Sequence, residues 1–163
     1  MMDRLKDECE RVLAELSSLP KETLYLGLPI TDDRVEEFER KIGLFISDDF
    51  KYLLKKHNGF SVMGTEVIGF KIEEFGESIG NIYEFEHFKA AHKMPLEFLP
   101  FSPDGRGNHY CLNLSNMSNG ICPVVFWQWD FDYASISDVE ECNGNFLEWV
   151  EEVLIEWGRD NNL

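Results

Sequence analysis

Residues 98–129 read FLPFSPDGRGNHYCLNLSNMSNGICPVVFWQW, and this stretch decides the fold class. Its apolar, β-branched and aromatic runs indicate three strands, at 97–101, 108–114 and 122–129. The breaks between them, SPDGRG and SNMSNG, are rich in Gly, Asn, Ser and Asp, which tight turns require. Because short turns join strands that pair antiparallel, the sequence predicts an antiparallel sheet here.

The chain before this sheet has helical periodicity. Three helices are predicted, at 3–17, 31–43 and 47–59. Thr31 and Ser47 are the N-cap candidates, and two acids follow each of them, where they favour the positive end of the helix dipole. Gly43 is a natural stop for the second helix. The segment YLGLPI, at 25–30, is expected to be a connector.

The remaining segments complete an α+β pattern. Residues 61–72 alternate and indicate a strand, residues 79–93 are compatible with a helix, and 133–136 is a candidate for a further strand. Apolar side chains at positions 146, 150, 154 and 157 mark a C-terminal helix. We therefore expect one domain, 1–163, in which residues 1–20 form an additional N-terminal helix. Its central antiparallel sheet of about five or six strands would have the N-terminal helices and the C-terminal helix packed around it.

The charge balance restricts the class of partner. Thirty-one Asp and Glu against fifteen Lys and Arg give a formal charge of −16. Such a surface repels phosphate backbones and anionic membranes, so neither nucleic acid nor a membrane is expected as a partner. It attracts basic proteins, at rates that fall with added salt. The alternative interpretation is that the excess acid only keeps the protein soluble.

Cysteine usage and the start of the chain favour a cytoplasmic protein. The four cysteines contain no C-x-x-C pair, and three of them lie in apolar or strand-like surroundings, where a thiol behaves as a small hydrophobe. The start, MMDRLKDECER, has no apolar stretch that resembles a signal peptide. The longest apolar run, 121–129, is far shorter than the ~20 residues needed to span a bilayer.

No catalytic or metal site is predicted from the motifs. His109 and Cys111 alternate onto one face of a strand, but they offer two ligands where zinc requires three or four. His87 and His92 are five residues apart and do not share a helix face. The segment DGRGN, at 104–108, lacks the phosphate-loop pattern and is interpreted as a hairpin turn, with its glycines supplying positive φ. No cofactor is expected.

The aromatic residues near the end of the predicted sheet have two interpretations. Phe126, Trp127 and Trp129 alternate along a strand, and core packing is their ordinary use. One of the tryptophans is also a candidate to face solvent and anchor a partner. Asp130 and Asp132 flank Phe131, where polar turn residues are expected in any case, so this pair of carboxylates does not indicate hydrolysis.

Several motifs, in order, resemble the SUKH superfamily, which unites yeast cell-wall synthesis regulators with bacterial toxin-immunity proteins. Residues 28–60 are similar to the family's pair of helices ending in Asn-Gly, with Ile46-Ser47 where Leu-Pro is common. Residues 98–115 and 122–132 are similar to its strands and glycine turns, with Asn108 and Asn113 where aspartates are usual. NGNFLEWVEEVL, at 143–154, looks like its terminal helix. The resemblance covers roughly residues 28–157.

This resemblance implies an α+β fold and no catalytic residues. Gly59, Gly105 and Gly107 match positions that shape the fold. For bacterial members it implies neutralisation of a secreted toxin, often a nuclease, by direct binding.

The leading hypothesis is therefore a non-enzymatic immunity protein that binds a basic toxin domain and blocks its active site. Acidic residues are the candidate contacts: Glu73, Glu74, Glu77, Glu84, Glu86, Asp130, Asp132, Asp138, Glu140 and Glu141. For each of them the alternative is a solvated surface acid. A regulatory scaffold of the same superfamily, without a toxin, is the second hypothesis. An enzyme acting on a small molecule, suggested by His109 and Cys111, is the third.

Overall fold

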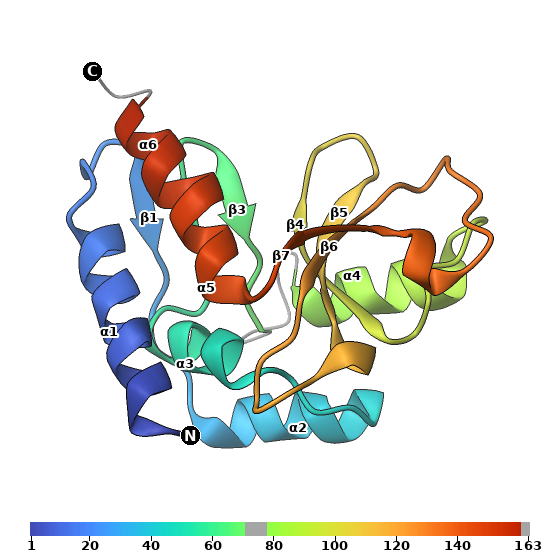
Figure 1. The fold of residues 1–163 in the computed structure, drawn as a ribbon, viewed down its shortest axis with the longest axis horizontal. Helices are drawn as coiled ribbons and strands as arrows, with labels where there is room; N and C mark the ends of the chain where they lie inside the picture. Colours follow the sequence, from blue (N-terminus) through green and yellow to red (C-terminus); the bar gives the residue numbers. More distant parts are fainter. Residues whose placement is uncertain (71–77, 161–163) are drawn as a thin grey trace.

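The computed structural model describes residues 1–70 and 78–160, and within them the predicted α+β class is confirmed. N-terminal helices, antiparallel strands and a C-terminal helix follow one another along the chain (Figure 1). The N-terminal helices are α1 (Asp3–Ser17), α2 (Asp32–Ile42) and α3 (Asp48–Lys56). Next come α4 (Ile79–Glu84), the π-helical turn η1 (Phe85–Lys89) and two short 3-10 turns, η2 (Leu114–Asn116) and η3 (Ile136–Asp138). The closing helix consists of α5 (Phe146–Trp149), η4 (Val150–Glu156) and α6 (Trp157–Asp160).

The strands form two sheets, so the expectation of one sheet of five or six strands is wrong. The first sheet has the order β1 (Leu24–Leu26), β2 (Phe60–Val62), β3 (Thr65–Val67). The second has the order β4 (Phe98–Pro103), β5 (His109–Asn113), β6 (Val124–Trp127), β7 (Glu140–Asn143). The backbone N–H of Ile68 donates to the carbonyl of Phe101 (2.8 Å), which joins the two sheets at the point where β3 has ended. Because β3 ends at Val67, no ladder of backbone hydrogen bonds joins it to β4.

Three strand boundaries differ from the expectations. The predicted strand at 61–72 is a hairpin in its described part, because Met63 and Gly64 both have positive φ (49° and 88°) and turn the chain back. β1 (Leu24–Leu26) overlaps the start of the predicted connector at 25–30 and pairs with β2. The candidate strand at 133–136 is a loop, and the strand that pairs with β6 begins at Glu140.

The helix ends follow the predicted residues, but the capping chemistry differs. Gly43 ends α2 in the left-handed conformation (φ 74°). Thr31 and Ser47 occupy the N-cap positions with extended backbone, yet neither side chain makes the capping hydrogen bond. The Ser47 side chain is instead buried beside the Asp49 carboxylate. No helix in the described part of the chain is both long and apolar enough to cross a membrane.

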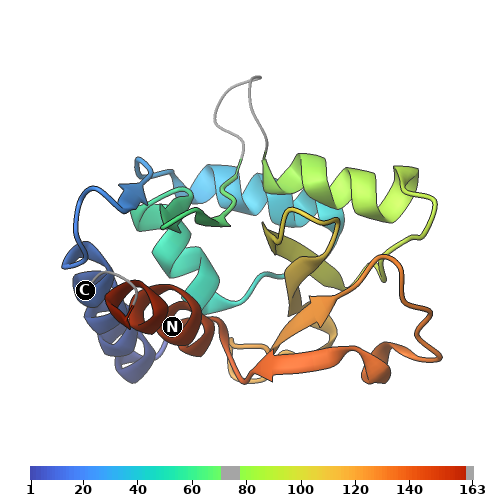
Figure 2. The ribbon, with the colours of Figure 1, turned by 90° about the horizontal axis from the view of Figure 1, so that it is seen from above.

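An aromatic cluster joins the helices to one face of the four-stranded sheet. The ring centroid of Phe146 lies 4.7 Å from that of Phe50 and 5.2 Å from that of Phe101. Trp149 packs on Phe101 (4.9 Å) and on Tyr110 (5.3 Å). These edge-to-face contacts fasten α3 and α5 to β4 and β5. Figure 2 shows α1 and the C-terminal helix side by side at one end of the molecule, and the four-stranded sheet at the other.

Asp49 is a buried carboxylate where α3 begins, close to the start of α5. Its Oδ1 accepts a hydrogen bond from the Phe50 backbone N–H (2.8 Å), and its side chain has no solvent exposure. Burial raises the pKa of Asp49 to about 6, although Ser47 and the amides of Phe146 and Leu147 favour the ionised form. Burial is the larger influence, so the pKa of this carboxylate is raised.

This pKa predicts that Asp49 makes the fold more stable as the pH falls. Between pH 4 and pH 6 the native state binds a proton that the unfolded state has released, so this contribution is complete below about pH 4 and is lost as the pH rises through 6. The shift of about 2 pKa units corresponds to roughly 3 kcal/mol. When the pH is lowered from 7 to 4, the free energy of unfolding measured in urea should rise more for wild type than for Asp49→Asn, by an amount of that order. The matched control Asp48→Asn should show the same pH dependence of unfolding as wild type. If Asp49→Asn also showed the wild-type pH dependence, the raised pKa assigned to Asp49 would be contradicted.

Candidate functional site

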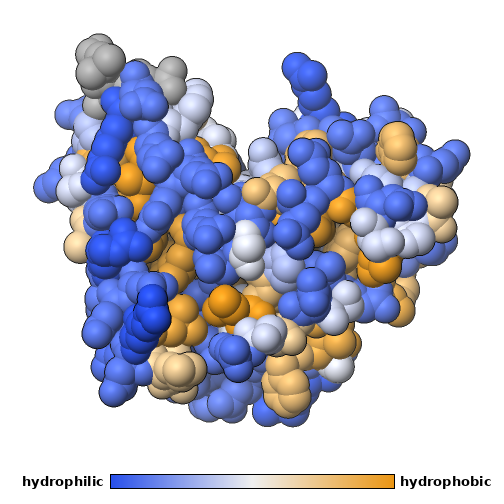
Figure 3. Space-filling view, in the orientation of Figure 1, coloured by the Kyte–Doolittle hydropathy of each residue, from blue (hydrophilic) through white to orange (hydrophobic). Residues whose placement is uncertain are grey.

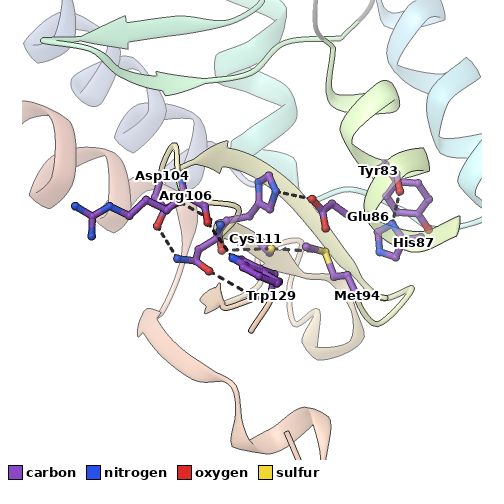
Figure 4. A network of polar contacts seen from close by, with 10 residues as sticks. Tyr83, Glu86, His87, Met94, Asp104, Arg106, Cys111 and Trp129 are labelled. Atoms are coloured by element: carbon purple, nitrogen blue, oxygen red, sulfur yellow. Dashed lines mark hydrogen bonds and ion pairs between the residues drawn. The ribbon is translucent and has the colours of Figure 1, made fainter. Parts of the chain in front are cut away.

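The second face of the four-stranded sheet carries a separate small core. It consists of Met94, Phe98, Cys111, Val125, Trp127 and Val139, with Tyr133 packed against it. The segment after η1 and the loop between β6 and β7 cover this face. The polar contacts around it come from three parts of the chain: η1, the turn between β4 and β5, and the β6–β7 loop (Figure 4).

The β4–β5 turn, 104–108, is closed by its own aspartate. Asp104 Oδ1 accepts hydrogen bonds from the backbone N–H groups of Arg106 (2.7 Å) and Asn108 (3.1 Å), and Oδ2 accepts one from Asn108 Nδ2 (2.8 Å). Partial burial opposes ionisation of Asp104, but these hydrogen bonds outweigh it and lower its pKa. Gly105 and Gly107 both have positive φ (82° and 92°). The Asp104 carboxylate already accepts hydrogen bonds from the two backbone amides that a phosphate would need. This favours the hairpin interpretation of DGRGN.

Trp129 lies against this turn and is held in place by it. Its indole Nε1–H donates to the carbonyl of Arg106 (2.9 Å), and its backbone N–H donates to Asn108 Oδ1 (3.2 Å). A Cβ atom at Gly107 would lie 2.6 Å from Trp129 Cδ1, so only glycine permits the contact. Trp127 is buried, whereas Trp129 remains 49% exposed. Of the two tryptophans at the end of β6, Trp129 is therefore the one that faces solvent.

Residues 128–141 form a surface on which apolar side chains lie among acids; we call it the β6–β7 loop surface. Phe131 is 51% exposed and Ile136 is 38% exposed, which the sequence analysis did not anticipate. The sequence QWDFDYASISDVEE contains five carboxylates and no Lys or Arg. The loop is ordered by its own contacts: Gln128 N–H donates to the Tyr133 hydroxyl (3.0 Å), and Ser135 and Asp138 form a capping box.

The structure separates the predicted contact acids other than Glu86 into three groups. Asp130, Asp132, Asp138, Glu140 and Glu141 are exposed on the β6–β7 loop surface. Glu84 is exposed at the end of α4 and pairs with Lys89 (3.6 Å). Glu73, Glu74 and Glu77 lie outside the described residues.

Glu86 requires a correction, because it is buried and is not a surface acid. Its Oε1 lies 3.0 Å from Nε2 of His109, which is also buried, so the pair joins η1 to β5. A buried carboxylate with such a partner serves the interior of the fold. No local pattern in the sequence indicates this pairing, because the two residues are 23 positions apart.

His87 is also buried, and both of its ring nitrogens face carbonyl oxygens. Nδ1 lies 2.6 Å from the carbonyl oxygen of Tyr83, and Nε2 lies 2.9 Å from that of Pro95. His87 therefore ties η1 to the segment that leads into β4, and it is not placed to act on a ligand.

Neither member of the His109 and Cys111 pair is directed toward a common ligand. Cys111 Sγ contacts Met94 Sδ (3.9 Å), while His109 Nε2 is taken by Glu86. Burial raises the pKa of the Cys111 thiol well above its ordinary value, which makes it a poor nucleophile. Within 1–70 and 78–160, no three His, Cys, Asp or Glu side chains are grouped as a metal site would require. What this region does present to solvent is the β6–β7 loop surface.

Comparison with known proteins agrees with this fold. The model of the SMI1 / KNR4 family (SUKH-1) matches residues 29–152, which confirms the resemblance predicted from the motifs. A crystal structure of a protein from Pseudomonas syringae pv. tomato is similar over 90% of this chain and 98% of that chain, with a TM-score of 0.61. Its sequence identity is 16%, so this likeness concerns the fold. The search of curated proteins found no match.

The contact between Gly107 and Trp129 predicts a difference between two turn glycines. Both Gly105→Ala and Gly107→Ala place a side chain at positive φ, which costs about 1–2 kcal/mol. At Gly105 the added Cβ meets nothing within 4 Å, whereas at Gly107 it displaces Trp129. Gly107→Ala should therefore lower the free energy of unfolding in urea by a further ~1–3 kcal/mol and shift the Trp129 indole N–H resonance. Equal losses and an unmoved resonance in both variants would refute this account of Trp129.

Proposed function

The chain belongs to the SMI1 / KNR4 family (SUKH-1), and we propose that it is a non-enzymatic immunity protein that neutralises a basic toxin by binding it. The observation that carries this proposal is the β6–β7 loop surface, where Trp129, Phe131 and Ile136 are exposed among five carboxylates. A surface of aromatic anchors within a rim of one charge is typical of protein interfaces.

The position of Trp129 supports a role as an anchor. One hydrogen bond from the indole, one from the backbone N–H and the contact with Gly107 hold Trp129 before any partner arrives. An anchor that is already ordered loses little conformational entropy on binding, so more of its buried area contributes to affinity. Phe131 packs on Tyr133, with ring centroids 4.7 Å apart, which orders the second aromatic side chain in the same way.

The charge of the surface supports a basic partner. The carboxylates of Asp130 and Asp132 are exposed on either side of Phe131, and the chain as a whole carries −16. A toxin that cleaves nucleic acid must be basic where it holds phosphate, so it would be drawn toward this surface. Opposite charges across an interface accelerate encounter, and the effect falls as salt is added.

Affinity capture from the source cells tests the proposal. The tagged chain should retain one small basic protein at low salt, and that protein should be inactive while bound and regain its toxic activity when released. Recovery of a large signalling assembly, or of no basic protein, would instead favour a regulatory scaffold of the same family.

A matched pair of charge variants tests the surface. Asp130→Lys/Asp132→Lys should lower affinity for the captured protein about tenfold or more, mainly through slower association. Glu156→Lys/Asp160→Lys changes the net charge equally, but on the C-terminal helix, which Figure 1 shows on the opposite side of the molecule from the β6–β7 loop. Surface plasmon resonance should separate the two variants. Equal losses in both would mean that overall charge, and not this surface, is recognised.

A further inference from the structure

A hollow of about 560 Å³ lies between α2 and the helix formed by α4 and η1; we call it the α2–α4 groove. Its apolar walls are made by Phe38, Ile42 and Leu44 on one side and by Tyr83, Phe88 and Leu96 on the other. Phe88 is 60% exposed and Leu96 is 52% exposed. Large apolar side chains gathered around a hollow are typical of a binding surface.

The π-helical turn builds one wall of this groove. In η1 the Ala90 N–H donates to the Phe85 carbonyl (2.8 Å), which widens the last turn of the helix. The turn buries Glu86 and His87 and leaves Phe88 exposed over the groove. π-turns of this kind are frequent at functional sites.

The same contacts hold Leu96 in position. The Tyr83 hydroxyl donates to the Leu96 carbonyl (3.1 Å), and His87 Nε2 holds the preceding carbonyl of Pro95 (2.9 Å). Both residues that hold the segment are themselves buried in α4 and η1. The groove is therefore formed without a partner, which reduces the entropic cost of filling it.

A second hollow extends the groove along α2. It has a volume of about 540 Å³ and shares Gly43 and Leu44 with the first. Phe45, which lines it, is 81% exposed. In Figure 3 hydrophobic residues interrupt the hydrophilic surface along the lower edge, where α2 lies in Figure 1. The two hollows meet at Gly43 and Leu44; the first is mainly apolar, whereas charged side chains of Glu36, Glu39, Arg40 and Lys51 also line the second.

One short segment, residues 92–97, borders both the groove and the β6–β7 loop surface. A smaller hollow of about 150 Å³ is lined by His92 and Pro95 on one side and by Tyr133 and Ile136 on the other. Leu96, next to Pro95, already belongs to the groove. A protein seated on the loop surface therefore reaches the groove across residues 92–97.

We infer that the α2–α4 groove receives a segment of the same basic partner, one that carries two or three large apolar side chains flanked by Lys or Arg. The identity of that partner rests on the proposed function, while the groove itself does not. A second copy of this chain is a poor occupant, because two chains of −16 repel each other. Two acids, Glu84 and Glu97, and one base, Lys41, stand on the rim of the first hollow, and the second hollow is lined by two acids and two bases. The local surplus is therefore one acid, and the preference for basic flanks rests mainly on the overall charge of −16.

A synthetic peptide provides the probe, so the test does not need the natural partner. The peptide has twelve residues, with Leu at positions 1, 5 and 8 and Lys at most others; one counterpart replaces Leu with Ser, and another replaces Lys with Glu. Titrated into the ¹⁵N-labelled full chain, the Leu/Lys peptide should saturably shift the amide resonances of Phe38, Ile42, Leu44, Phe88 and Leu96. The two counterparts should bind at least tenfold more weakly.

Two groove variants and one control complete the test. Leu96→Asp and, separately, Phe88→Ser should each lower the affinity for the Leu/Lys peptide at least tenfold. Leu28→Asp should leave the affinity unchanged, because Leu28 is 76% exposed but does not line the groove. Equal binding of the Ser counterpart, shifts confined to 128–141, or full affinity in both groove variants would overturn the inference. A dimer in sedimentation that Leu96→Asp abolishes would also overturn it, in favour of a second copy as occupant.

The outcomes for the groove and for the proposed function are separable. A captured toxin whose affinity is unchanged by Leu96→Asp would leave the immunity function standing and remove the groove from it. Peptide binding in the groove, with no toxin captured from cells, would support a groove for basic apolar segments and count against the immunity role.

Discussion

The fold depends on the side-chain amide of Asn58, which makes the pair of backbone hydrogen bonds that a neighbouring strand would otherwise make. Asn58 Nδ2 donates to the carbonyl of Phe70 (2.8 Å), and the Phe70 N–H donates to Asn58 Oδ1 (2.7 Å). The backbone beside it leaves no room for side chains: a Cβ at Gly69 would lie 2.7 Å from the Asn58 carbonyl carbon, and one at Gly27 would lie 2.6 Å from the Gly59 oxygen. The end of α3, the exit from β1 and the exit from β3 therefore meet at one point. This meeting directs the chain from the first sheet toward the second.

The two faces of the four-stranded sheet have different roles. One face packs on α3 and α5 through Phe50, Phe101 and Phe146, and this packing supplies rigidity. The other face carries the small core under η1 and the β6–β7 loop, and its margins hold the exposed aromatic and acidic side chains. A binding surface placed on a rigid sheet keeps its anchors ordered, which is what the proposed capture of a partner requires.

The acids of this chain serve in two different ways. Glu39, Asp49 and Glu86 are buried, and each is used inside the fold: Glu39 Oε2, for example, accepts from the Ile46 N–H (2.8 Å) and lies 3.4 Å from Lys51 Nζ. The acids of the β6–β7 loop surface are exposed and available to a partner. Glu140 and Glu141 also lie on the edge strand β7, where charge discourages pairing with another sheet. An acidic composition thus combines interior hydrogen bonding and protection of an edge with the recognition role proposed for the exposed acids.

Features that depend on a few neighbouring residues follow from the sequence alone. Helix periodicity placed α1, α2 and α3, and glycine chemistry placed the end of α2 and the β4–β5 turn. Tertiary structure decided what depends on residues far apart in the chain: that the strands form two sheets, that Glu86 is buried against His109, and that Trp129 lies on Gly107. The physical reason is that turns and helix faces are set by local backbone geometry. Burial and strand pairing depend instead on which distant segment arrives at the same place.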